Sequence, residues 1–283
     1  MKKVLFAVML VLMFAATASA RHKVGVVERL NVTPEKFREM TGNIESGNIV
    51  IVANTTERPE FTFYSSMNQM IMALNAGEID EMLFPETQAE YFLSVNPDHV
   101  IKCMVMMKDA PFLFSFGFSA ENKDLCESFS KALAEMKRDG TLVTLYGKYI
   151  MGADTAVFEE SAIADPSRMS QAPVVFRKFD DAPEIRIAVT GDMPPIDYIA
   201  PDGSAQGFNA AILAEICGRL GLNVKLQNIE SGARVAMLAS GRSDAVFWFE
   251  HKRGAKDSHD APEGVILSEP YYQFNTFYHI GRQ

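Results

Sequence analysis

The amino-acid sequence predicts an α/β protein of two related lobes, each with a mixed sheet flanked by helices. Strand-like apolar runs alternate with helical segments in both halves of the chain, and one local pattern occurs twice. That pattern is a helix end, a glycine and an aspartate that opens an apolar strand, at residues 73–84 and again at 237–249. The 283 residues, 48% of them hydrophobic, also suffice for a large core.

The repeated pattern fixes the expected elements of each half. Strands are predicted at 24–27 and 49–52 in the first half and at 185–189 in the second. Gly77 and Gly241 are expected just past a helix end, where glycine tolerates a positive φ.

Two helices are predicted between the halves. Apolar residues recur every three or four positions from 125 to 136, with Asn122 as a candidate N-cap and Asp139-Gly140 as the stop. A second, shorter apolar face covers 142–149. Residues 151–183 then lose periodicity and become rich in Pro, Ser, Asp and Ala, which predicts a linker.

The N-terminus has the features of a secretory signal peptide. Lys2 and Lys3 precede the apolar stretch 4–16, and Ala18-Ser19-Ala20 forms an A-x-A cleavage site. A membrane anchor is the alternative, but the stretch would span only roughly 20 Å of a hydrocarbon core about 30 Å thick. We therefore expect cleavage after Ala20 and a periplasmic protein.

Charge and cysteine content exclude other classes. The net charge of −9 disfavours nucleic-acid binding, because such a surface repels phosphates. Cys103, Cys126 and Cys217 permit at most one disulfide and have no metal-site spacing. We expect no metal and no cofactor, and the abundant methionines are interpreted as flexible core filling.

The second half carries a series of motifs with a specific order and spacing. They are Met193-Pro194-Pro195-Ile196-Asp197-Tyr198, Asp202 to Asn209, Leu220 to Val224, Gly241-x-x-Asp244 and Ser268-Glu269-Pro270-Tyr271-Tyr272. This series resembles the first lobe of bacterial family 3 extracellular solute-binding proteins, the periplasmic receptors of amino-acid ABC importers. The resemblance implies the two-lobed type II periplasmic-binding-protein fold, with a ligand cleft between the lobes.

The first half resembles the second lobe and the closing helices of the same family. Residues 24–31 look like the strand and loop that open lobe two, and 131–150 look like the family's C-terminal helices. This order is reversed relative to the family, so we infer a circular permutation of the lobes. The alternative is half of each of two tandem receptors, with lobes paired between chains by domain swapping; we favour a monomer.

The resemblance divides the chain into five parts. The expected domains are a signal peptide at 1–20, lobe two at 21–110, closing helices packed on lobe one at 111–150, a linker at 151–183 and lobe one at 184–283.

The resemblance also implies candidate ligand contacts. The family's carboxylate-binding arginine position falls near Lys256 and its threonine position near Arg253. Arg253 is the candidate for the carboxylate, with His251 and Lys256 as neighbours, and a solvated loop is an equal alternative. Glu86 is the candidate for the amino group. Asp197 and Tyr198 follow the Pro-Pro motif. Trp248 and Phe249 stand at a strand end where the family has small residues, and ligand contact, core packing and an exposed rim are all open for Trp248.

One further candidate comes from the residues themselves. Arg29 and Asn31 precede Thr33-Pro34, which is typical of a helix start whose free N–H groups can face an anion.

These observations predict a non-enzymatic protein that closes two lobes on a small polar solute, an amino acid or related organic acid, and delivers it to an ABC importer permease or a membrane sensor. One alternative is a degenerate interaction module whose cleft is blocked by Trp248 and Phe249. A third hypothesis is a cyclic-acid dehydratase using Glu86 or His251, although no catalytic constellation supports it.

Overall fold

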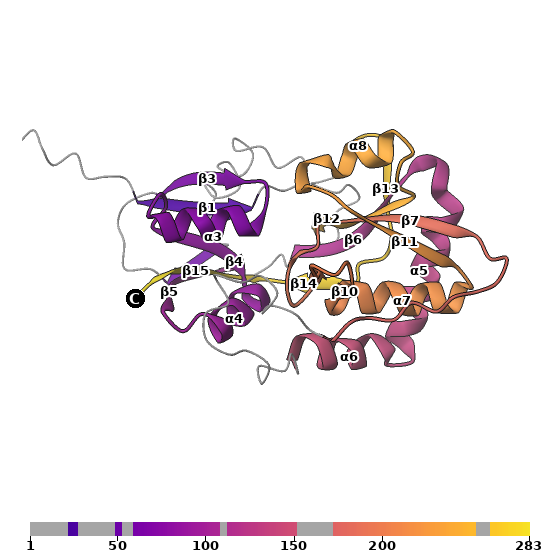
Figure 1. The fold of residues 1–283 in the computed structure, drawn as a ribbon, viewed down its shortest axis with the longest axis horizontal. Coiled ribbons are helices and arrows are strands. Elements are labelled where there is room, and N and C mark those ends of the chain that lie inside the picture. Colours follow the sequence, from indigo (N-terminus) through magenta and orange to yellow (C-terminus); the bar gives the residue numbers. More distant parts are fainter. Residues whose placement is uncertain (1–21, 28–48, 53–58, 108–111, 152–171, 253–260) are drawn as a thin grey trace, which may run out of the picture.

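The computed structural model describes residues 22–27, 49–52, 59–107, 112–151, 172–252 and 261–283. Two lobes lie side by side along the long axis of the molecule (Figure 1), and each contains a six-stranded sheet. The two-lobed α/β prediction is confirmed.

Lobe two is built around strands from the first half of the chain and one from its C-terminus. The strands are β1 (Lys23–Val27), β2 (Ile49–Val52), β3 (Glu60–Tyr64), β4 (Glu81–Pro85), β5 (His99–Met107) and β15 (Thr276–Arg282). Their order is β2-β5-β15-β4-β1-β3. β1 runs parallel to β3 and β4, whereas β15 is antiparallel to β4 and β5. The helices are α3 (Met67–Ala76) and α4 (Glu86–Val95).

Lobe one contains the second sheet, in the order β11-β7-β12-β6-β13 with β14 also paired to β6. Its strands are β6 (Phe112–Ser119), β7 (Glu184–Val189), β11 (Asn223–Asn228), β12 (Ala245–Lys252), β13 (Val265–Leu267) and β14 (Tyr272–Phe274). A small sheet joins β8 (Asp192–Met193), β9 (Asp197–Ile199) and β10 (Ala205–Gln206). The helices are α5 (Lys123–Arg138), α6 (Thr141–Tyr146), α7 (Gly207–Leu220) and α8 (Arg234–Ala239), with short turns at Ala120–Asn122, Gly147–Met151 and Ser231–Ala233.

The repeated sequence pattern corresponds to a repeated structural unit. Gly77 and Gly241 have positive φ values of 75° and 64°, as predicted. The aspartate that follows accepts a backbone hydrogen bond from the parallel strand next to its own, β1 or β7: Lys23 N–H to Asp80 at 2.8 Å, and Arg186 N–H to Asp244 at 2.7 Å. The order β3-β1-β4-β15-β5 therefore has the same plan as β11-β7-β12-β6-β13.

Two connections cross between the lobes. The chain passes from β5 in lobe two to β6 in lobe one, and from β14 in lobe one to β15 in lobe two. The expected boundaries need correction at both places, since β15 lies outside lobe one and 111–150 includes a strand of its sheet. The apolar pattern of such strands predicts burial but does not say which sheet they join.

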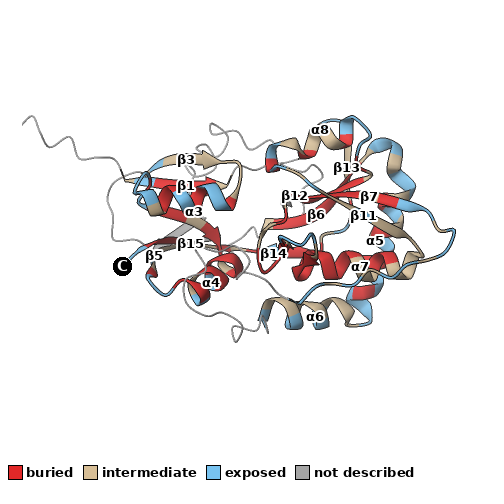
Figure 2. Cartoon of the chain, in the orientation of Figure 1, coloured by how far each residue is buried: buried red, intermediate tan, exposed pale blue. Residues whose placement is uncertain are grey.

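Separate cores stabilise the two lobes, and buried residues line the inside of each (Figure 2). Lobe one has an aromatic core in which Phe116 packs edge-on to Phe129, as Phe118 also does. At the crossing, Phe112 stacks on Phe274 with ring centroids 5.4 Å apart. The O–H of Tyr272 donates to Thr87 of lobe two at 2.9 Å, so this side of the lobe junction is buried.

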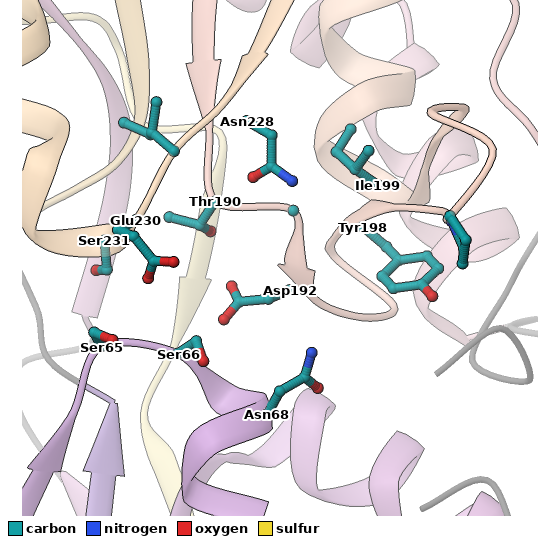
Figure 3. Close-up of a pocket in the computed structure, with 13 residues that line it drawn as sticks. Ser65, Ser66, Asn68, Thr190, Asp192, Tyr198, Ile199, Asn228, Glu230 and Ser231 are labelled. Carbon is teal, nitrogen blue, oxygen red and sulfur yellow. The ribbon is translucent and has the colours of Figure 1, made fainter. Parts of the chain in front are cut away.

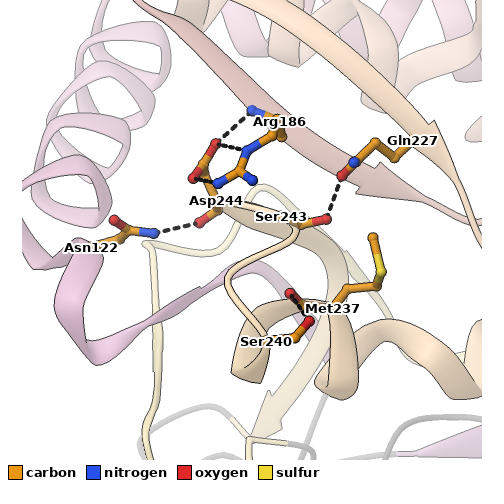
Figure 4. Close-up of polar contacts among 7 residues, drawn as sticks. All are labelled: Asn122, Arg186, Gln227, Met237, Ser240, Ser243 and Asp244. Carbon is orange, nitrogen blue, oxygen red and sulfur yellow. Dashed lines mark hydrogen bonds and ion pairs between the residues drawn. The ribbon is translucent and has the colours of Figure 1, made fainter.

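Asp244 links three segments of lobe one (Figure 4). Its carboxylate accepts from the backbone and the guanidinium of Arg186, and its carbonyl accepts from the Asn122 amide. Burial alone would raise the pKa of Asp244, but the hydrogen bonds and charge of Arg186 hold it below the ordinary 3.8.

Replacement of Asp244 by Asn should therefore lower the urea midpoint at pH 7. A depressed native pKa contributes stability above the ordinary value, and that stability is lost as the pH falls through the native pKa. The difference from wild type should shrink below about pH 4. Asp98→Asn, which alters an exposed carboxyl in a turn, is the control; a pH-independent difference for Asp244→Asn would contradict this account.

Candidate functional site

A cavity of about 500 Å³ lies between the two lobes (Figure 3). Most of its lining lies at the carboxyl ends of β3 in lobe two and of β7 and β11 in lobe one. Each of these strands belongs to the parallel part of its sheet, and ligands bind at such strand ends in open α/β sheets. Tyr198, Ile199 and Pro201 come from β9 and the turn after it. Its lining residues are Ser65, Ser66 and Asn68 from lobe two, and Thr190, Gly191, Asp192, Tyr198, Ile199, Pro201, Asn228, Ile229, Glu230 and Ser231 from lobe one.

The buried carboxylate of Asp197 hydrogen-bonds two residues that line the cavity, Thr190 and Gly191. It is 3% exposed, and its Oδ2 lies 3.2 Å from Thr190 Oγ1, 3.3 Å from the Gly191 nitrogen and 3.1 Å from Trp248 Nε1. Burial raises the pKa of Asp197, while these donors oppose the rise. The carboxylate thus fixes the loop that follows β7.

Asp192 connects the two lobes across the cavity. Its Oδ2 accepts the backbone N–H of Met67, the first residue of α3, at 2.9 Å. Burial raises the pKa of Asp192 to about 6; the charge of Asp197 adds to the rise, whereas the Met67 N–H, Thr190 and Arg234 oppose it. Ser66 caps the same helix from its own lobe through Gln69 N–H.

The guanidinium of Arg234 donates hydrogen bonds to residues of its own lobe, lobe one. Its Nε donates to the Ser231 carbonyl at 3.0 Å, Nη2 to Ser231 Oγ at 2.9 Å and Nη1 to the Trp248 carbonyl at 3.1 Å. The residue is 3% exposed. It therefore ties the loop after β11 to β12.

The structure separates the predicted contacts into three groups. Tyr198 lines the cavity. Asp197 lies behind its wall, and so does Trp248, whose indole packs among Phe114 and Tyr272. Trp248 and Phe249 are not among the described residues that line the cavity, and Phe249 is fully buried over Gly117, so contact between either side chain and a solute stays a prediction.

The irregular register of β12 accompanies the buried position of the Trp248 side chain. A bulge lies between Val246 and Phe249, and Trp248 has a φ of 71°. An L-residue rarely adopts this left-handed conformation, and here it coincides with an indole buried against Asp197.

The other predicted contacts lie away from the cavity or outside the described residues. Glu86 opens α4 and is not among the described lining residues, so its role toward an amino group stays a prediction. His251 lies in β12 opposite Leu113, but its side chain is outside the description. Arg253, Arg29 and Asn31 are outside the described residues altogether.

Sequence reasoning missed most of the lining. Ser65 and Ser66 follow a strand and precede a helix, which is the pattern of a capped strand-to-helix loop. Asp192 stands five residues before Asp197, directly ahead of the Pro-Pro motif and three residues after the end of β7, and a polar residue close to a strand end was the available clue.

The described part of the chain contains no helix long and apolar enough to cross a membrane. Among the same residues, no three His, Cys, Asp or Glu side chains gather where they could hold a metal ion.

Part of lobe one matches a known protein family in sequence. Residues 185–255 match the model of bacterial extracellular solute-binding proteins, family 3. A segment of 84 residues is also 34% identical to a probable histidine-binding protein of Campylobacter jejuni. That match covers 29% of this chain and 32% of the relative, so the chain matches about a third of the relative's length. The resemblance to family 3 in lobe one is thereby confirmed.

Solved structures with a similar chain trace include a putative L-cystine ABC transporter from Listeria monocytogenes. Its sequence is 9% identical, the match covers 92% of this chain and 82% of that chain, and the TM-score is 0.39. The GluR0 ligand-binding core in complex with L-glutamate has 12% identity, coverages of 94% and 86%, and a TM-score of 0.39. The relationship to family 3 rests on the sequence match and not on these likenesses.

Trp248→Phe should destabilise the protein by about 1–3 kcal/mol, because it removes a donor from a buried carboxylate. Denaturant unfolding followed by circular dichroism measures the change. In a double-mutant cycle with Asp197→Asn, the two effects should be non-additive because the partners are in contact. Additive effects would contradict the assigned hydrogen bond.

Proposed function

We propose that this protein is a periplasmic solute-binding protein that closes two lobes on a small polar solute in the cavity and delivers it to an ABC importer or a membrane sensor. The observation that carries the proposal is the cavity itself, lined from both lobes by polar strand-end loops. Closure about two crossing connections is a common way for such a cleft to enclose a ligand.

The family relationship supports the same conclusion. The ten lining residues that come from lobe one, Thr190 to Ser231, all fall within the segment that matches family 3. The Campylobacter jejuni relative is named a probable histidine-binding protein. An amino acid or a related small molecule is therefore the solute class that we propose.

We favour solute binding over the degenerate-module alternative. That alternative required Trp248 and Phe249 to fill the cleft, and both lie outside its lining. The dehydratase alternative is not favoured by any described contact.

Thermal unfolding tests solute binding. Purified residues 21–283 should be stabilised by about RT ln(1 + [L]/Kd) by one class in a panel of amino acids, organic acids and polyamines. Asn68→Ala should then weaken binding roughly tenfold, the loss of about one hydrogen bond's worth of free energy. Met72→Ala, an exposed change on the same helix, is the control. Equal affinities of the two variants would place the solute elsewhere.

We also propose that the lobe order is circularly permuted. The matching strand orders of the two lobes support it, with β15 and β6 as equivalent crossing strands. In addition, β1 begins at the same end of lobe two as the chain ends (Figure 1).

A rearranged chain tests the permutation. Residue 283 would be joined to residue 22 by a short Gly/Ser linker, and new termini would open within 152–171. Because permutation is tolerated where termini are close and exposed, this chain should fold as a monomer and bind the same solute. A chain that folds only as a swapped dimer would support the tandem-receptor alternative instead.

A further inference from the structure

We propose that the solute is cationic and that Asp192 selects it while coupling its binding to contact between the lobes. This inference rests on the proposed function of the cavity. It concerns the charge of the solute, which the family relationship leaves open.

The described part of the cavity lining is negatively charged. Of its 13 described residues, only Asp192 and Glu230 carry charged side chains, and both are acidic. Figure 3 shows these two carboxylates directed into the same space between the lobes. The neutral remainder includes hydroxyl and amide oxygens from Ser65, Ser66 and Asn228 that can accept further hydrogen bonds.

Asp192 is held in position before any solute binds. Its Oδ2 accepts the Met67 N–H at 2.9 Å, which fixes the carboxylate between the lobes. A carboxylate can accept about four hydrogen bonds, so this contact leaves capacity for an ammonium or guanidinium donor. The half-buried position disfavours the charged carboxylate in the absence of a counter-charge, and a bound cation would offset that cost.

No described lining residue carries a positive charge that could pair with an anionic solute. The nearby guanidinium of Arg234 already donates to Ser231 and to the Trp248 carbonyl. The N-terminus of α3, which would attract an anion, already has the Asp192 carboxylate on its first N–H. A solute of net negative charge would also be repelled by Asp192 and Glu230.

The same geometry makes Asp192 a coupling residue. One of its oxygens contacts lobe two at Met67, while the carboxylate faces a cavity whose remaining walls come mainly from lobe one. A cation bound to Asp192 is therefore adjacent to the helix that brings Asn68 to the cavity. Primary amines and guanidinium compounds small enough for about 500 Å³ fit this arrangement.

Isothermal titration at pH 7.5 with isosteric probes tests the proposal. L-arginine is compared with neutral L-citrulline, and putrescine is compared with 1,4-butanediol and with succinate. We expect at least one of the two cations to bind the wild-type protein at least tenfold more tightly than its neutral counterpart, and succinate not to bind.

Three variants separate charge from lobe contact. Asp192→Asn keeps an oxygen for the Met67 N–H, so it should retain the unliganded melting temperature but lose at least tenfold in cation affinity. Asp192→Ala should lose both. Glu230→Gln removes an exposed charge from the same cavity and should cost only about twofold to threefold, as expected for a rim charge.

The outcomes distinguish this inference from the proposed function. Tight binding of citrulline or succinate, sensitive to Asn68→Ala, would overturn the cationic solute and leave the solute-binding function standing. Cation binding unchanged in Asp192→Asn would overturn the role of Asp192. No binding of any probe, from folded protein free of co-purified ligand, would overturn the cationic solute; the solute-binding function would fall as well only if the wider panel of amino acids, organic acids and polyamines gave no thermal stabilisation.

Discussion

Each of the two sheets depends on a strand that arrives from the other lobe. β6 follows lobe two and pairs with β12 and β13, and β15 follows lobe one and pairs with β4 and β5. Because these strands lie inside their sheets and not at an edge, neither lobe completes its sheet without the crossing. The crossings meet near the stacked rings of Phe112 and Phe274, and the cavity opens where the parallel strands of both lobes end.

The three carboxylates in and behind the cavity wall differ in how far they are exposed. Asp197 is fully enclosed and serves the wall, Asp192 stands at the surface of the cavity and reaches the other lobe, and Glu230 is exposed at the rim. Arg234 supplies the neighbouring positive charge, but its donors are directed to Ser231 and Trp248. The described lining therefore presents two carboxylates, whereas the guanidinium of Arg234 is engaged inside lobe one.

Much of the fold follows from local patterns in the sequence. The Gly77–Asp80 and Gly241–Asp244 pairs predicted a repeated unit because a helix stop and a strand start each leave a local signature, and the related resemblance to a two-lobed family extended it to the whole chain. The site was predicted less well. Side-chain direction at Trp248 depends on a bulge, and the contact between Asp192 and Met67 joins residues 125 positions apart. Neither has a local signature.

The central claim is that one solute contacts both lobes at the same time. Hydrogen–deuterium exchange, with and without a solute that stabilises the protein, measures this most directly. The account predicts simultaneous protection of 65–68 in lobe two and of 190–192 and 228–231 in lobe one. Protection confined to one lobe, or lying outside these loops, would contradict it.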